Sequence, residues 1–131
     1  MPIIVTYNVL CQALANKNAF PLATDYQLDP KIRLQKLKTK LDGWIQQHAV
    51  ICLQEVSRTW YLDLVSFFKG CNYTFIFMSY GIPAADYMGV GIAFPNKYIR
   101  EGGGMYCRYE GGTWGGRIGV DTSGGIKSSR Y

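Results

Sequence analysis

The chain has 131 residues, of which 48% are hydrophobic and 15% aromatic, and it carries a formal net charge of +5. This apolar content is enough for the core of one compact domain, and it excludes a chain that is disordered along its whole length. No segment approaches the roughly 18 consecutive apolar residues of a membrane helix, and no signal peptide opens the chain, so we expect a soluble, intracellular protein.

The positive charge and a pI near 9.1 favour an anionic partner such as nucleic acid, although lysine and arginine also solubilise ordinary protein surfaces. The cysteines form no C-x-x-C pair and show no spacing typical of zinc sites. They stand at Cys11, Cys52, Cys71 and Cys107. We therefore expect reduced, mostly structural thiols.

The first predicted element is a strand. Residues 3–7 are dense in β-branched and aromatic side chains and end at polar Asn8, which is typical of a strand buried on both faces. After a long connection, Asp29 and Pro30 supply an N-cap and a first-turn proline. Apolar residues then recur at helical spacing, which predicts an amphipathic helix over 31–47.

A second buried strand is predicted at 49–54, where a short apolar run ends at Glu55. Because a helix connects the two strands, they should be parallel with a right-handed crossover. Ser57 is a candidate N-cap for a second helix over roughly 58–69, whose apolar residues again recur at helical spacing.

Two further strands are predicted at 73–80 and 88–94, which gives the element order β-α-β-α-β-β. Beyond this point the composition changes, because most of the fifteen glycines lie late in the chain. The sequence therefore predicts one domain over 1–100 and a glycine-rich C-terminal tail over 101–131.

Asn8 and Glu55 are the candidate site residues, because each follows an apolar strand of the same predicted parallel pair. Ligands gather beyond the carboxyl ends of such strands, so the two side chains should converge. Mg²⁺ prefers one or two carboxylates together with water and substrate phosphate. The alternative is that Asn8 caps a turn and Glu55 solvates a strand end.

The segments around these residues resemble the endonuclease/exonuclease/phosphatase superfamily, and most closely its deadenylase and nocturnin-like branch. The opening segment Thr-Tyr-Asn-Val-Leu-Cys-Gln-Ala-Leu-Ala at 6–15 resembles the first motif of that superfamily. The resemblance continues through Arg33, Ile-Cys-Leu-Gln-Glu-Val at 51–56 and Gly-Val-Gly-Ile-Ala-Phe at 89–94, and it covers roughly residues 3–98.

The resemblance implies that Asn8 belongs to a catalytic polar network and that Glu55 is both a catalytic residue and a ligand of Mg²⁺, the cofactor. It implies the front half of a four-layer α/β/β/α sandwich. The later aspartate, asparagine and histidine motifs of the superfamily are missing from this sequence. His48 is the chain's one histidine and precedes the strand that Glu55 follows, so it does not replace the missing group.

The sequence therefore predicts a Mg²⁺-dependent phosphodiesterase or nuclease acting on RNA or another phosphoester, incomplete and inactive alone. The alternative is a non-catalytic assembly module that retains half of the fold. Half of a sandwich exposes a large apolar sheet face, which soluble monomers rarely tolerate. We therefore expect another protein chain to complete the sandwich, or the chain to be a truncated gene product.

Overall fold

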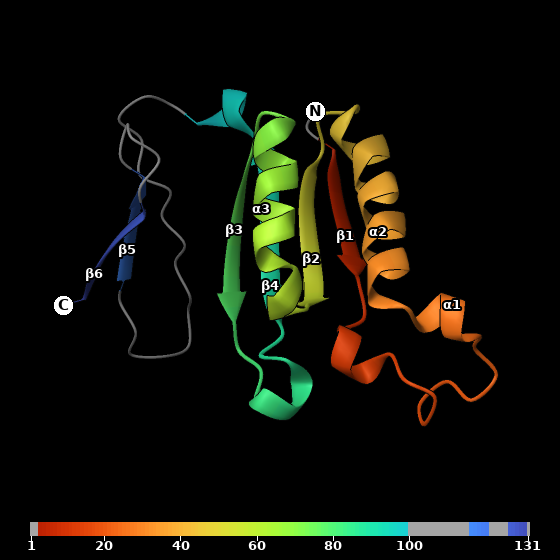
Figure 1. Cartoon of the computed structure of the whole chain (residues 1–131). Helices are drawn as coiled ribbons and strands as arrows, with labels where there is room; N and C mark the ends of the chain where they lie inside the picture. The colour runs from red at the N-terminus through yellow and green to blue at the C-terminus, as the bar shows by residue number, and fades with distance from the viewer. Residues whose placement is uncertain (1–2, 100–115, 121–125, 131) are drawn as a thin grey trace. The chain divides into compact units, whose positions relative to one another are not determined.

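The computed structural model describes residues 3–99, 116–120 and 126–130. The chain forms two compact units, Met1–Tyr98 and Ile99–Tyr131 (Figure 1). The larger unit combines helices with a four-stranded mixed sheet, so the predicted α/β class is confirmed. Within the described residues, every helix is too short or too polar to span a bilayer.

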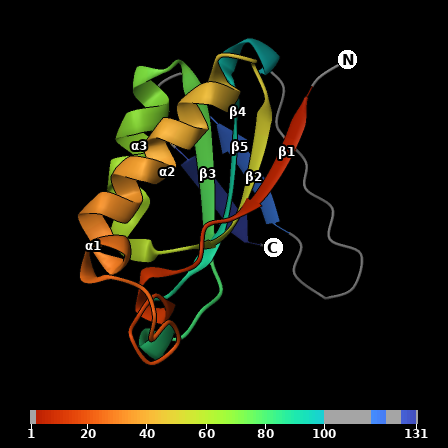
Figure 2. The same cartoon turned by 90° about the vertical axis from the view of Figure 1, so that its right-hand side faces the viewer.

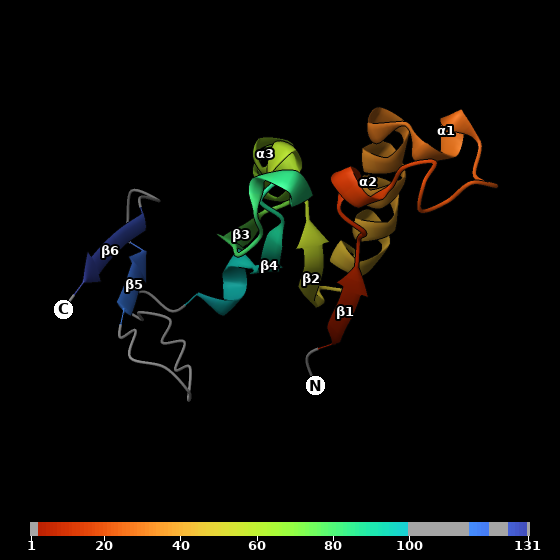
Figure 3. The ribbon, with the colours of Figure 1, turned by 90° about the horizontal axis from the view of Figure 1, so that it is seen from below.

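The sheet of the larger unit has the strand order β1-β2-β4-β3. Its strands are β1 (Ile4–Asn8), β2 (Val50–Val56), β3 (Tyr73–Ser79) and β4 (Gly89–Pro95). As the helical connection predicts, β1 and β2 are parallel, with Asn8 opposite Gln54. β4 runs antiparallel to both β2 and β3. The carboxyl ends of β1 and β2 therefore lie side by side, as the view from below shows (Figure 3).

The main helices are α2 (Pro30–Ile45) and α3 (Tyr61–Gly70), and a short helix α1 (Asp25–Leu28) precedes them. The predicted cap of α2 is confirmed, because the carboxylate of Asp29 accepts hydrogen bonds from the backbone N–H of Lys31 and Ile32, both at 2.9 Å. The helix ends two residues before the predicted limit. The chain then turns through His48, whose φ is 54°.

Ser57 does not cap a helix, so that prediction is wrong. A short 3-10 turn (Arg58–Trp60) precedes α3, and the Ser57 side chain makes no capping hydrogen bond. Its hydroxyl instead accepts from the backbone N–H of Gln12 at 2.7 Å and lies 3.4 Å from the sulfur of Cys11. The fully buried serine thus ties the connection after β1 to the start of α3.

One face of the sheet is covered by α2 and α3, which both lie on the same side of it (Figures 2 and 3). The core forms between these helices and the inward residues of the strands. It includes Leu37, Leu41, Ile45, Ile51, Leu53, Leu64, Phe68, Phe75 and Ala93. Gly91 of β4 leaves room for the ring of Phe75, which a side chain there would overlap.

The opposite face, here called the open face, is exposed although it is apolar. Ile4 is 70% exposed and Met78 is 62% exposed, and Val90 and Ile92 are exposed as well. The expectation that the first strand is buried on both faces is therefore wrong. β1 is an edge strand with one uncovered face, so its residues alternate between exposed and partly buried.

The smaller unit contains β5 (Gly116–Val120) and β6 (Ile126–Arg130), which pair in antiparallel fashion. The rest of the glycine-rich tail predicted at 101–131 lies outside the described residues. Three of the four cysteines lie within the described part, and all three are free thiols. Cys107 lies outside it.

Candidate active site at the ends of strands β1 and β2

Asn8 and Glu55 meet, although 47 positions separate them in the sequence. The side-chain amide nitrogen of Asn8, the last residue of β1, donates to Oε1 of Glu55 at 2.7 Å. Glu55 is the penultimate residue of β2, the parallel neighbour of β1. The structure therefore brings together the two residues that the sequence singles out.

The amide of Asn8 is held from both ends. Its oxygen accepts from the backbone N–H of Leu10 at 2.8 Å, while its nitrogen donates to Glu55. Leu10 itself lies in the left-handed region, with φ of 57°, and an asparagine side chain that bonds two residues on stabilises such a turn. Asn8 thus caps a turn and orients a carboxylate at the same time, so the two interpretations of this residue are compatible.

Glu55 has an unusual backbone for a strand residue, with φ of 54°. The pairing register of β2 with β4 shifts between Leu53 and Val56, which marks an irregularity at Glu55. Strict alternation would place Glu55 on the covered face with Leu53 and would place Val56 on the open face. Val56 is instead fully buried, and the Glu55 carboxylate turns towards Asn8. Such bulges commonly re-aim a functional side chain.

This conformation carries an energetic cost of about 1–2 kcal/mol for a residue other than glycine. A glycine at this position would avoid the cost and lose the carboxylate. Residues held in sparsely populated backbone regions cluster at functional sites, where the surroundings enforce the geometry. His48 and four other described residues share a positive φ, but at Glu55 this conformation also aims a carboxylate at Asn8, and the two features together favour a role beyond solvating a strand end.

Arg33 of α2 fixes the segment that follows Asn8. Its guanidinium donates to the backbone carbonyls of Val9 at 2.9 Å and Leu10 at 2.6 Å, and to the side-chain oxygen of Gln12 at 2.6 Å. Burial lowers the pKa of Arg33, an effect that Cys11 and Tyr7 oppose. The sequence points to Arg33 only through the family resemblance, because its backbone partners leave no pattern in the residues.

The donor set at this site is small. Within residues 3–99 and the two described strands of the smaller unit, no three residues of the types His, Cys, Asp and Glu lie together as a group that could hold a metal ion without other ligands. Glu55 supplies one carboxylate, and His48 lies exposed just before the other end of β2. The site therefore offers one anionic ligand with an oriented amide beside it.

Neither a protein-family model nor a curated protein matches this chain. The functional interpretation of Asn8 and Glu55 thus depends on their chemistry, their position and the resemblance of the surrounding segments.

Proposed function

We propose that the chain carries the front half of a Mg²⁺-dependent phosphodiesterase site of the endonuclease/exonuclease/phosphatase type, acting on RNA or another phosphoester. In this proposal Glu55 is the metal ligand and Asn8 orients its carboxylate. The observation that carries the proposal is the 2.7 Å hydrogen bond between the two side chains at the ends of parallel strands, with Glu55 held in a left-handed conformation.

The donor chemistry of the pair fits Mg²⁺. One carboxylate oxygen of Glu55 binds the neutral amide of Asn8, and the carboxylate keeps further lone pairs for a hard cation. Mg²⁺ is commonly held by one or two carboxylates, with water and substrate phosphate as the other ligands. When bound, the ion supplies charge stabilisation to a phosphoryl oxygen. Asn8 fixes the direction of the carboxylate without adding charge.

The open face of the sheet supports the second part of the proposal, which is that another polypeptide completes the domain. Apolar side chains of β1, β3 and β4 reach solvent there, including Ile4, Met78 and Ile92. In a four-layer sandwich a second sheet packs on such a face about 10 Å away. That polypeptide would also contribute the acid and base groups of the later superfamily motifs that are missing from this sequence.

A metal-binding measurement tests the role of Glu55 independently of catalysis. Mn²⁺, a paramagnetic substitute for Mg²⁺, should broaden the amide NMR signals around Glu55, and Glu55→Gln should abolish this broadening. Asp42→Asn is the matched control, because Asp42 is also a carboxylate that accepts from a side-chain amide, that of Gln46 at 2.8 Å. Equal broadening in wild type and Glu55→Gln would overturn the metal-ligand assignment.

Catalysis is tested by Mg²⁺-dependent hydrolysis of oligoadenylate and of a generic phosphodiester. Equal rates for wild type and Glu55→Ala would exclude catalysis by the isolated chain. Activity that appears only with a co-purifying chain, and disappears with Glu55→Ala, would establish a split site. Metal binding without hydrolysis in either form would favour the alternative, a non-catalytic assembly module.

The completion of the sandwich is tested by the mass of the protein in solution. Light scattering coupled to gel filtration should give a mass above the 14.8 kDa of one chain. Charged substitutions on the open face, such as Ile92→Lys, should return the mass to that of a monomer. A stable wild-type monomer would contradict the need for a second polypeptide.

A further inference from the structure

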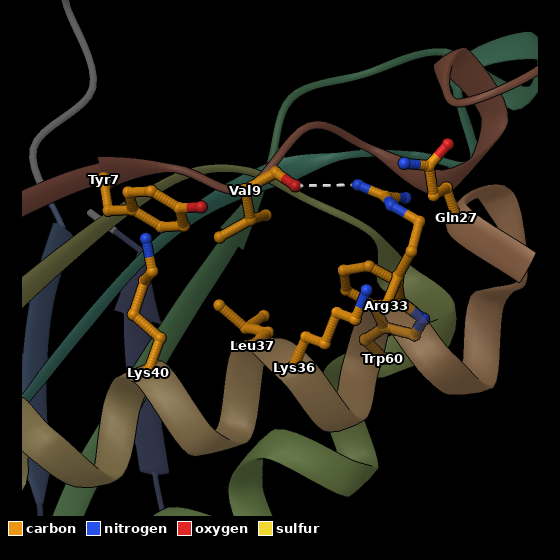
Figure 4. Close-up of a pocket in the computed structure, with 8 residues that line it drawn as sticks. All are labelled: Tyr7, Val9, Gln27, Arg33, Lys36, Leu37, Lys40 and Trp60. Carbon is orange, nitrogen blue, oxygen red and sulfur yellow. Dashed lines mark hydrogen bonds between the residues drawn. The ribbon is translucent and has the colours of Figure 1, made fainter. Parts of the chain in front are cut away.

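A cavity of about 410 Å³ lies between β1 and α2, apart from the Asn8–Glu55 pair (Figure 4). Its lining comes mainly from the edge strand and from one side of the helix. The lining residues are Tyr7, Val9, Gln27, Arg33, Lys36, Leu37, Lys40 and Trp60. Tyr7 of β1 and Val9, which follows the strand, flank Asn8, so the cavity lies on the helix side of the strand, whereas Asn8 follows the alternation of the open face.

Three cations line this cavity and no carboxylate does. Arg33, Lys36 and Lys40 are three, four and seven positions apart, so they share one side of α2. Ion pairs within the described residues involve only Lys17 and Lys38 among the lysines and arginines. The three cavity cations therefore have no acidic partner in the described part of the chain.

Lys36 and Lys40 are exposed, but Arg33 and Lys40 are each held by a neighbour on the strand side of the cavity. Arg33 is fixed by its bonds to Val9 and Leu10 and lies 5.2 Å from the centre of the Trp60 ring. The ammonium of Lys40 lies 4.6 Å from the centre of the Tyr7 ring. Figure 4 shows Lys40 and Tyr7 at one end of the cavity and Arg33 with Lys36 at the other.

The walls strengthen the field of these charges. Val9, Leu37 and Trp60 are almost fully buried and form an apolar wall, and charges beside such a wall interact more strongly than charges in water. Like charges three and four residues apart on a helix repel each other. An anion bound among them offsets this repulsion, because it is attracted by all three positive charges.

We propose that this cavity binds a phosphate group, either free or carried by a nucleotide. Phosphate fits because it bears more than one negative charge and has several acceptor oxygens for the two ammonium groups and for the guanidinium donors that Val9, Leu10 and Gln12 leave free. Tyr7 adds a hydroxyl near Lys40 (Figure 4). The proposal does not depend on the metal site, because no cavity residue belongs to the Asn8–Glu55 pair.

The test is an NMR titration of the full chain at low salt with inorganic phosphate, 5′-AMP and adenosine. The double variant Lys36→Gln/Lys40→Gln removes two cavity cations. The control variant Lys31→Gln/Lys69→Gln removes the same charge from two exposed lysines outside the cavity. Urea unfolding of both variants verifies that they remain folded.

Wild type should bind inorganic phosphate and 5′-AMP, and shifts should centre on the cavity. The cavity variant should bind about a hundredfold more weakly, because each lost charged hydrogen bond costs about a factor of ten, while the control should stay close to wild type. Tighter binding of 5′-AMP than of phosphate would identify a nucleotide ligand, and equal binding would identify free phosphate. Equal weakening in both variants, adenosine binding as tightly as 5′-AMP, or no binding at millimolar concentration would overturn the proposal.

Discussion

The two faces of the four-stranded sheet differ in how the chain itself completes them. Ile51 of β2 faces the helices and is 0% exposed, whereas Ile92 of the neighbouring β4 faces the other way and is exposed. Both are isoleucines in adjacent strands, and both belong to regular alternating patterns. The covered face therefore has its partner within the same chain, while the open face has the composition of a buried surface and no cover among residues 3–98.

This difference separates what stabilises the domain from what the domain offers to other molecules. The helices close one core, which holds Leu41, Leu64 and Phe68 fully buried. The open face carries Thr6 and Gln54, whose side chains bond each other at 2.9 Å, beside its apolar residues. Burial of the first face drives folding, and the second face remains available for assembly.

The largest expected effect distinguishes the faces directly. Ile51→Ala should lower the free energy of unfolding by about 2–5 kcal/mol, because it leaves a cavity in a packed core. Ile92→Ala removes the same atoms from the open face and should change the free energy of unfolding of the isolated chain by less than about 1 kcal/mol. Urea unfolding followed by circular dichroism measures both.

Comparable losses in the two variants would mean that the open face is buried in the folded chain. In that case the two faces do not differ in burial, and the open face does not call for a partner chain. If Ile92→Ala instead weakens only a complex seen by light scattering, the difference between the faces becomes a difference between folding and assembly.

Much of the covered face follows from the sequence. The apolar periodicity of α2 and its Asp29 cap predict the helix, and the short apolar run before Glu55 predicts β2. Burial of β1 on both faces was predicted wrongly, because an apolar strand with an uncovered face has the same composition as one with two covers. What distinguishes them is whether a second layer packs on the strand, which no local pattern shows: the inner strand β4 also exposes Val90 and Ile92 on the open face.

The candidate site is predictable in its residues but not in its geometry. The positions of Asn8 and Glu55 after apolar runs predict that they meet, and their hydrogen bond agrees. The left-handed φ of Glu55 leaves no sequence signal, because glycine or asparagine is the usual marker of such a backbone. The anchoring role of Arg33 also depends on backbone carbonyls, which every residue carries.

The next largest expected effect is on the stability of variants at Glu55, whose side chain the bulge of β2 turns away from the covered face. Glu55→Ala and Glu55→Gly both remove the carboxylate and its bond to Asn8, so their difference isolates the backbone. Glu55→Gly should be more stable than Glu55→Ala by about 1 kcal/mol, because glycine adopts a positive φ without steric cost. Urea midpoints give the difference.

At Gln54, whose φ is not positive, the same pair of substitutions serves as the control. There Gln54→Gly should be the less stable variant, as expected for glycine in an ordinary strand. If alanine is the more stable replacement at both positions, Glu55 is not strained, and the inference from strain to function at this site is lost.

The smallest expected effect is a change in the pH dependence of stability, caused by Tyr73 on the covered face. The buried hydroxyl of Tyr73 donates to the carbonyls of Ala49 at 3.1 Å and Ile45 at 3.3 Å. Burial raises the pKa of Tyr73 above its ordinary value of 10.0, and Tyr98 and Cys71 raise it further. The folded state thus holds this proton more tightly than the unfolded state, so its contribution to stability is complete below pH 10.0 and is lost as the pH rises through the raised pKa.

Tyr73→Phe removes this titration and should flatten the alkaline fall of the unfolding free energy. Near neutral pH the same variant should lower the free energy of unfolding by about 1 kcal/mol, because the buried hydrogen bonding of the hydroxyl is lost. Tyr80→Phe is the control, because Tyr80 is exposed and its loss should leave the alkaline fall as in wild type. Urea unfolding at pH 7 and above pH 10 measures both. If wild type and Tyr73→Phe lose stability equally above pH 10, the covered face is open enough to hydrate a charged phenolate, and the two faces differ less than their exposures indicate.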